Sequence, residues 1–271
     1  MHDNLLRRLA NTRAGLYFRH AFGVRAPEYI PNFTEVVSDL FVWRCDDIWE
    51  TYFDLTHIAG ILNPEMRLDY SISLVIFSSD GIEIGRHTQT VTFAESYLVR
   101  INDLPGTPNG HGTFAVLHMA PLSAVFGSER TCLVERGYVS YRRKSDSSTL
   151  RSYVHGNLYG IGGNPTTRRF RTLTLSIRQT HEYQPQVRLD DCERCEITLV
   201  NYSPRHLNVE ALALRGGKSE QRLNISLNPR GSVVIDSSTL PLERIALRAK
   251  LPMPRPLLFK YYASHFDVFH G

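Results

Sequence analysis

The chain has 271 residues, of which 42% are hydrophobic and 21% charged, a balance typical of a globular protein and not of a fibrous or disordered one. This length suggests two domains of about 100–150 residues each. The net charge is +4, and 27 of the 31 Lys and Arg residues are arginine. These arginines are scattered among acidic residues, whereas nucleic-acid binding requires a clustered basic patch. We therefore expect no nucleic-acid partner.

The first thirty residues combine leucines with arginines. Leu5, Leu9 and Leu16 recur at a near-helical period, which predicts an amphipathic helix and linker over residues 1–30. The apolar side of this helix could lie against the protein itself, a partner or an anionic membrane surface. No signal-peptide core occurs here, and no stretch has the roughly 18–20 apolar residues that span a bilayer. We expect a cytoplasmic protein without a transmembrane segment.

After residue 31 the pattern changes to short β-strands. Residues 36–43, 51–58 and 71–77 are rich in β-branched and aromatic side chains. Asp80-Gly81 follows, a strong signal for a type I′ hairpin turn, in which both central residues have positive φ. Further strands recur about every 8–12 residues, without the helices that a parallel sheet would require. The sequence therefore predicts an all-β sandwich protein.

An internal repeat is the most informative feature of the sequence. The turn Asp80-Gly81 matches Gly216-Gly217, and residues 86–104 then match residues 222–240 without a gap. Later segments match in the same order at a smaller offset: 112–118 with 243–249, 137–141 with 257–261, and 152–156 with 267–271. The last match places His155 and His270 at one position, before a glycine that closes each copy.

The repeat predicts two tandem β-sandwich units, immunoglobulin-like or jelly-roll-like, that arose by internal duplication. We place them over residues 31–180 and 181–271. The segment Asn-Pro-Arg-Gly-Ser-Val-Val-Ile-Asp at 228–236 resembles turn-to-strand segments of bacterial immunoglobulin-like domains. The first copy is longer because of loops at 105–111, 123–134 and 144–149. Loops on a rigid scaffold often carry function, although inserted length can also be plain surface.

The histidines of the first copy raise the possibility of metal or acid–base chemistry. His111 and His118 are seven residues apart and therefore project to opposite faces of a strand. No H-x-H or H-E-x-x-H spacing occurs, so we expect no metal and no cofactor. His155 and His270 suit a structural role, because an imidazole N–H can satisfy a carbonyl at a strand end and the following glycine permits a turn. A ligand or catalytic role for this pair stays open.

Two further motifs resemble functional sites only in part. Cys192 and Cys195 form a C-x-x-C without the second ligand pair of a zinc site or the helix of a redox motif, so we expect ordinary thiols. The Gly-rich residues 156–164 precede Arg168 and Arg169 but lack the helix of a phosphate-binding loop. This segment is interpreted as a connection between the two units.

Two hypotheses of function follow. The first is a non-catalytic binding or assembly protein that contacts a protein or glycan through first-unit loops and the connector at 156–171. Exposed tyrosines favour this role because their rings supply contact area at low entropic cost. The candidate contacts are His111, His118, Tyr153, His155, Tyr159, Arg168 and Arg169. The alternative is a hydrolytic or metal-assisted enzyme with His111, His118 or His155 in a cleft of the first unit.

Overall fold

The computed structural model describes residues 37–56, 69–92, 96–118, 137–145, 150–161, 180–202, 206–239, 243–251 and 253–271. Over these residues the protein is all-β, which confirms the predicted class. Apart from strands, the elements that we discern there are two short 3-10 turns, η2 (Ile101–Asp103) and η4 (Ser237–Thr239). The helix expected over residues 1–30 lies outside the described residues. In the described part of the chain, no helix has the length and apolar composition needed to cross a membrane.

The first nine strands form two antiparallel sheets, which together we call the first unit. Sheet A has the strand order β4-β3-β6-β1-β9 and sheet B the order β5-β2-β7-β8. The strands are β1 (Val37–Cys45), β2 (Trp49–Leu55), β3 (Tyr70–Ser78), β4 (Glu83–Val91), β5 (Tyr97–Arg100), β6 (Gly110–His118), β7 (Tyr138–Arg143), β8 (Ser152–His155) and β9 (Asn157–Ile161).

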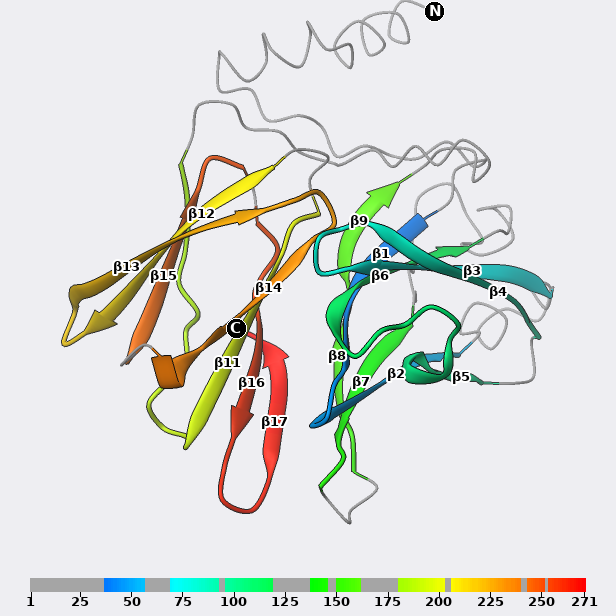
Figure 1. Cartoon of the computed structure of the whole chain (residues 1–271), viewed down its shortest axis with the longest axis horizontal. Helices are drawn as coiled ribbons and strands as arrows, with labels where there is room; N and C mark the ends of the chain where they lie inside the picture. Colours follow the sequence, from blue (N-terminus) through cyan, green and yellow to red (C-terminus); the bar gives the residue numbers. More distant parts are fainter. Residues whose placement is uncertain are drawn as a thin grey trace, which may run out of the picture.

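The remaining strands form the second unit, again as two antiparallel sheets. Sheet C has the order β10-β15-β12-β13 and sheet D the order β14-β11-β16-β17. The strands are β10 (His181–Tyr183), β11 (Arg194–Val200), β12 (Leu207–Arg215), β13 (Lys218–Leu227), β14 (Ser232–Asp236), β15 (Arg244–Ala249), β16 (Leu257–Tyr261) and β17 (Phe266–His270). In Figure 1 this unit lies to the left of the first, with β16 and β17 next to the boundary.

The two units have the same strand topology. When β10–β17 are matched in order to β1–β8, sheet C repeats the order of sheet A and sheet D repeats that of sheet B. Both long hairpins also shift register at the same place, between Ile76 and Phe77 in β3 and between Ala213 and Leu214 in β12. The repeat in the sequence therefore corresponds to a repeated arrangement of strands.

Two details of the sequence prediction are wrong. Tyr138 pairs with His155 and Leu257 pairs with His270, so Tyr138, and not Gly137, is the residue that matches Leu257. Gly137 has a φ of 96° and precedes the strand. The second error concerns the first hairpin, where Gly81 is the only turn residue with positive φ (77°). That turn is therefore not type I′.

The type I′ turn occurs instead in the second unit, where Gly216 and Gly217 have φ values of 56° and 76°. The difference follows from loop length. Only these two residues separate β12 from β13, whereas four separate β3 from β4. A two-residue loop requires positive φ at both central positions, and a longer loop does not.

The Gly-rich residues after His155 are not merely a connection. Residues 157–161 form β9, which pairs antiparallel with β1 at the edge of sheet A. Local sequence concealed this strand because glycines weaken the alternating pattern that identifies strands. The rest of the proposed connector lies outside the described residues.

Packing joins the two units into one core. Within the first unit, the Phe41 and Phe114 rings stack at 5.1 Å, and Phe53 meets Phe41 edge-on at 5.4 Å. The same buried cluster extends into sheet D through Phe259 and Val268. The opposite side of sheet D packs on sheet C in a second cluster. Sheet D is therefore buried on both sides, between sheet C and the first unit.

Candidate functional site

The structure does not bring the three first-unit histidines together. His111 and His118 lie at opposite ends of β6, where they pair with Arg44 of β1 and Ile72 of β3. Seven residues of strand separate the two histidines by about 20 Å. His155 ends β8 in the other sheet. The side chain of His118 lies outside the described part. Among the residues that the structure does describe, no group of three or more His, Cys, Asp or Glu side chains is arranged to hold a metal ion.

His111 is half-buried at the boundary between the units. Burial lowers its pKa, and the positive charge of Arg44 lowers it further. The ring is therefore neutral near pH 7, and it hydrogen-bonds the backbone of Ser232 in the second unit. These contacts give His111 a place in the junction between units.

The three cysteines that the structure describes, Cys45, Cys192 and Cys195, have the properties of ordinary unreactive thiols. Burial raises the pKa of Cys45 and of Cys195 to about 12. Burial also raises the pKa of Cys192, which is partly exposed. Because the thiolate is the reactive form, these surroundings disfavour nucleophilic and redox chemistry at the C-x-x-C pair.

A buried charge cluster links the units. Arg44 Nη1 of β1 lies 2.6 Å from Glu196 Oε2 of β11, and both side chains are almost fully buried. Arg194 lies 2.6 Å from the other oxygen of Glu196. Tyr261 donates to Glu196 over 2.8 Å and accepts from Trp49 Nε1 over 2.9 Å. Each of these groups already has a partner, so the cluster is suited to holding the junction and not to binding a ligand.

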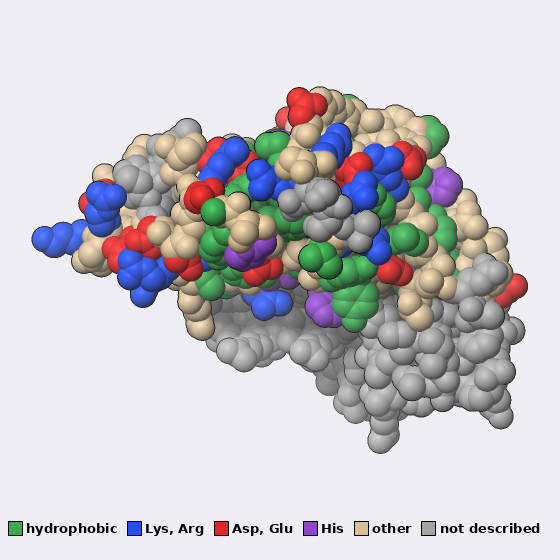
Figure 2. Space-filling model, turned by 90° about the horizontal axis from the view of Figure 1, so that it is seen from below, with side chains coloured by type: hydrophobic (Ala, Val, Ile, Leu, Met, Phe, Trp, Pro, Cys, Tyr) green, Lys and Arg blue, Asp and Glu red, His purple; other side chains and the backbone are tan. Residues whose placement is uncertain are grey.

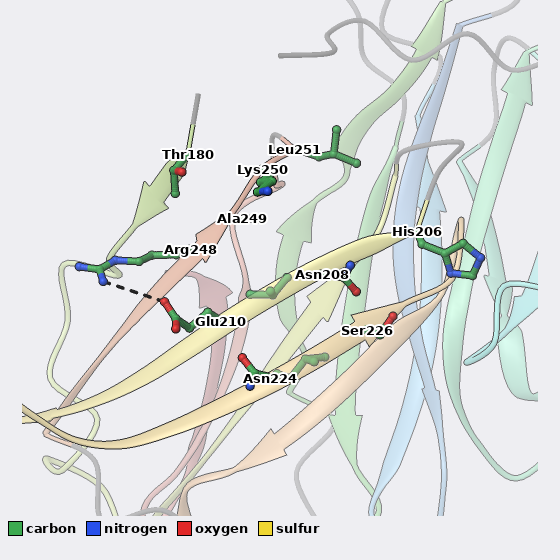
Figure 3. A pocket seen from close by; sticks show the side chains of 12 residues that line it. Thr180, His206, Asn208, Glu210, Asn224, Ser226, Arg248, Ala249, Lys250 and Leu251 are labelled. Atoms are coloured by element: carbon green, nitrogen blue, oxygen red, sulfur yellow. Dashed lines mark ion pairs between the residues drawn. The ribbon is translucent and has the colours of Figure 1, made fainter. Parts of the chain in front are cut away.

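An open groove of about 700 Å³ lies in the second unit, around sheet C. Figure 3 shows Asn208, Asn224 and Ser226 along β12 and β13, with Glu210 facing Arg248. Two of its charged side chains are already paired: Arg248 lies 2.8 Å from Glu182, and Glu210 lies 2.9 Å from Arg222. Lys250 also lines the groove and forms no ion pair within the described part of the chain. The lining that the structure describes contains no Tyr, Trp or Phe. The groove therefore has polar groups but, among the residues described, no Tyr, Trp or Phe ring on which a ligand could stack.

The outer face of sheet B is different, because it is aromatic and basic. Alternate residues of β2 point outward, and register places Arg100, Tyr52, Ser140 and Tyr153 in one row across the four strands. A second row runs through Leu98, Asp54, Tyr138 and His155. Tyr153 and Leu98 are half exposed. We call this surface, together with Glu50, Arg142 and Arg151, the sheet B face.

Glu50 organises one end of the sheet B face. Its carboxylate accepts hydrogen bonds from Arg100 Nη2 at 2.5 Å, Arg142 Nε at 2.7 Å and the Tyr52 hydroxyl at 3.0 Å. Burial alone would raise the pKa of Glu50, but the bonds from Arg142 and Tyr52 and the charge of Arg100 lower it. The carboxylate is therefore ionised and holds Tyr52 and both arginines in place.

Arg151 lies over this face between two tyrosines. Its guanidinium carbon is 5.0 Å from the centre of the Tyr52 ring and 5.3 Å from that of Tyr153. These distances are those of cation–π contacts. Ser140, which separates the two tyrosines in the row, is fully buried. The small serine leaves room for the rings and the guanidinium to form one continuous surface.

The corresponding face of sheet D is closed. When His155 is matched to His270, each residue of the first row of sheet B has an equivalent in sheet D. The equivalents of Arg100, Tyr52, Ser140 and Tyr153 are, in that order, Asp236, Glu196, Phe259 and Val268. Phe259 and Val268 are 0% and 2% exposed, within the core shared with the first unit. The same face of the repeat is thus a docking face in the second unit and is open in the first.

Two of the candidate residues from the sequence, Tyr153 and His155, lie together on the sheet B face. Tyr159 belongs to β9, but its side chain lies outside the described residues, as do Arg168 and Arg169. Sequence reasoning missed Tyr52 and Arg151. The alternation of Tyr52 with inward Phe53 in β2 was the available signal for the first; nothing local distinguishes Arg151.

Figure 2 shows one face of the molecule, on which the charge is mixed. On the face seen in Figure 2, basic and acidic side chains are interspersed over the described part and form no broad single-sign patch. No protein-family model matches the sequence, and a search of curated proteins finds no significant match. The arrangement of the sheet B face is therefore the basis for a functional assignment.

Proposed function

We propose that this protein is a non-catalytic binding protein that holds a carbohydrate chain on the sheet B face. In this proposal an internal duplication produced two sandwich units, immunoglobulin-like or jelly-roll-like in type. The second unit uses its equivalent face to dock on the first. The first unit keeps its own face for a ligand.

The observation that carries the proposal is the exchange of residue types between the two equivalent rows. Phe259 and Val268 in the docked row correspond to Ser140 and Tyr153 in the open row. A permanent docking face needs apolar side chains, whereas a half-exposed tyrosine beside polar groups suits a ligand that is itself polar. Tyr153, with 50% of its surface exposed, offers a ring on which a sugar can stack.

The size of the face favours a carbohydrate over a protein. Four strands, the longest of them 7 residues, spaced about 4.8 Å apart make a face of roughly 300 Å². A stable protein interface covers about 800 Å² on each partner. An oligosaccharide needs less, because aromatic stacking and charged hydrogen bonds act over one or two sugar rings.

Affinity electrophoresis tests this function. The wild-type protein is run in native gels that contain soluble dextran, xylan, polygalacturonate, alginate or dextran sulfate. We expect at least one polysaccharide to retard it, and we expect Tyr153→Ala to abolish most of that retardation because the stacking ring is lost. Leu223→Ala is the matched control, since Leu223 is an exposed residue on β13 of the other unit.

Two outcomes would contradict the proposal. One is a wild-type protein that migrates unchanged in every gel. The other is equal retardation of the wild type and the Tyr153 variant, which would place any binding elsewhere on the molecule. Circular dichroism of each variant checks that the fold is retained.

A further inference from the structure

Arg151 differs from the other arginines of the sheet B face in having no acidic partner within the part of the chain that the structure describes. Arg100 and Arg142 both bind Glu50. Among the described residues, Arg151 forms no ion pair, and its Nη1 atom is buried without a hydrogen-bond partner. A buried donor without an acceptor is costly, so this guanidinium is suited to donate hydrogen bonds to an anionic group.

The two tyrosines hold this cation in a defined orientation. The guanidinium contacts the rings of Tyr52 and Tyr153, and Tyr52 is itself fixed by its hydroxyl bond to Glu50. A guanidinium held against ring faces keeps its N–H groups at its edge for a planar acceptor. Asp54 is the other carboxylate of the face, and it lies in the second row, opposite Leu98 and Tyr138.

We infer that the ligand of the sheet B face is an acidic glycan, and that Arg151 selects it by binding its carboxylate or sulfate group. This inference rests on the proposed carbohydrate binding. One sugar ring stacks on Tyr153 while the anionic substituent of that ring, or of its neighbour, accepts hydrogen bonds from Arg151. The charge on Arg151, unpaired among the residues described, and the small size of the face favour an acidic glycan over an acidic protein partner.

The test compares polymers that differ only in charge. Isothermal titration calorimetry measures binding of the full chain to polygalacturonate, to the same polymer after reduction of its carboxyl groups, to dextran sulfate and to dextran. Arg151→Gln removes the cation, and Arg151→Lys keeps a charge without the planar fork. Arg215→Gln is the control, because Arg215 is an exposed cation at the end of β12 and its loss changes net charge equally.

We expect at least one charged polymer to bind about tenfold or more tightly than its uncharged counterpart. Arg151→Gln should remove that preference, Arg151→Lys should retain part of it, and Arg215→Gln should leave it unchanged. A preference for polygalacturonate assigns a carboxylate, and a preference for dextran sulfate assigns a sulfate. Equal losses in the Arg151→Gln and Arg215→Gln variants would mean general charge attraction and would overturn the inference.

The outcomes also separate this inference from the function on which it rests. Binding to neutral and charged polymers alike, lost in Tyr153→Ala but unchanged in Arg151→Gln, would leave carbohydrate binding in place and refute the acidic ligand. Absence of binding to all four polymers would refute the acidic ligand, and together with unchanged migration in every gel it would refute both. Binding that does not depend on Tyr153 would also refute both.

Discussion

His270 Nε2 donates a hydrogen bond to the main-chain oxygen of His155 over 2.8 Å. The two histidines that close the repeated units therefore meet at the junction. A carbonyl oxygen can only accept, so Nε2 carries the hydrogen. The other ring nitrogen, Nδ1, is buried without a partner. Burial lowers the pKa of His270, and the positive charge of Arg255 lowers it further.

This lowered pKa predicts a loss of stability in mild acid. Unfolded histidine takes up a proton near pH 6.5, but folded His270 does so only at lower pH. The unfolded state thus binds more protons below about pH 6.5, and the free energy of unfolding falls as pH falls through that range. Urea denaturation at several pH values between 8 and 5 measures this pH dependence of the free energy of unfolding. His270→Gln should flatten the dependence, and His265→Gln, an exposed change, should not.

The ion pair between Arg44 and Glu196 should contribute strongly to stability. Arg44→Met leaves Glu196 buried without one of its cations, and we expect a loss of about 3 kcal/mol in the free energy of unfolding. Arg248→Met breaks an ion pair to Glu182 in which both side chains are 42% exposed, and it should cost less than about 1 kcal/mol. Similar losses in the two variants would contradict a special role for the buried pair.

Gly81 should be the least replaceable turn glycine. It has a φ of 77°, and a Cβ atom there would lie 1.9 Å from the Pro229 carbonyl oxygen in the second unit. Gly216 also has positive φ, but a Cβ there meets nothing within 4 Å. Thermal unfolding should show a loss of about 1 kcal/mol for Gly216→Ala and of about 3 kcal/mol or more for Gly81→Ala. Equal losses of stability in the two variants would mean that the close approach of Gly81 to Pro229 adds no cost to the substitution.

The thiols should react in an order set by burial. At pH 8 iodoacetamide should label Cys192 well before Cys45 and Cys195, because burial holds the pKa of the latter two at about 12. Mass spectrometry of tryptic peptides after timed quenching measures the rates. In guanidinium chloride all three should react alike. Rapid native labelling of Cys195 would instead indicate a reactive C-x-x-C pair.

Apart from β9, the sequence was a good guide to the strands and to their repetition, because both depend on local pattern. Alternating apolar residues identify β3, and the match between residues 86–104 and 222–240 follows from the sequence alone. Turn geometry was less predictable. Asp80-Gly81 has the composition of a type I′ turn, but its loop is longer and the hairpin packs on the second unit, where Ser232 donates to Ser79.

The buried charge cluster could not be read from the sequence. Arg44, Glu196 and Tyr261 are separated by up to 217 positions along the chain, and each is a residue type that is usually exposed or only partly buried. Their pairing depends on the docking of sheet D against the first unit. Nothing in the local pattern around any one of them indicates that contact.

The sequence by itself determined that this protein is built from antiparallel strands and that the same order of elements occurs twice. Those properties come from a two-residue period and from similarity between segments, which are local quantities. Only the tertiary structure decided which copy of a repeated face is buried: Phe259 and Val268 are covered by the first unit, while Tyr153 in the equivalent row remains exposed. Burial depends on residues brought together from distant parts of the chain, and so does the candidate site.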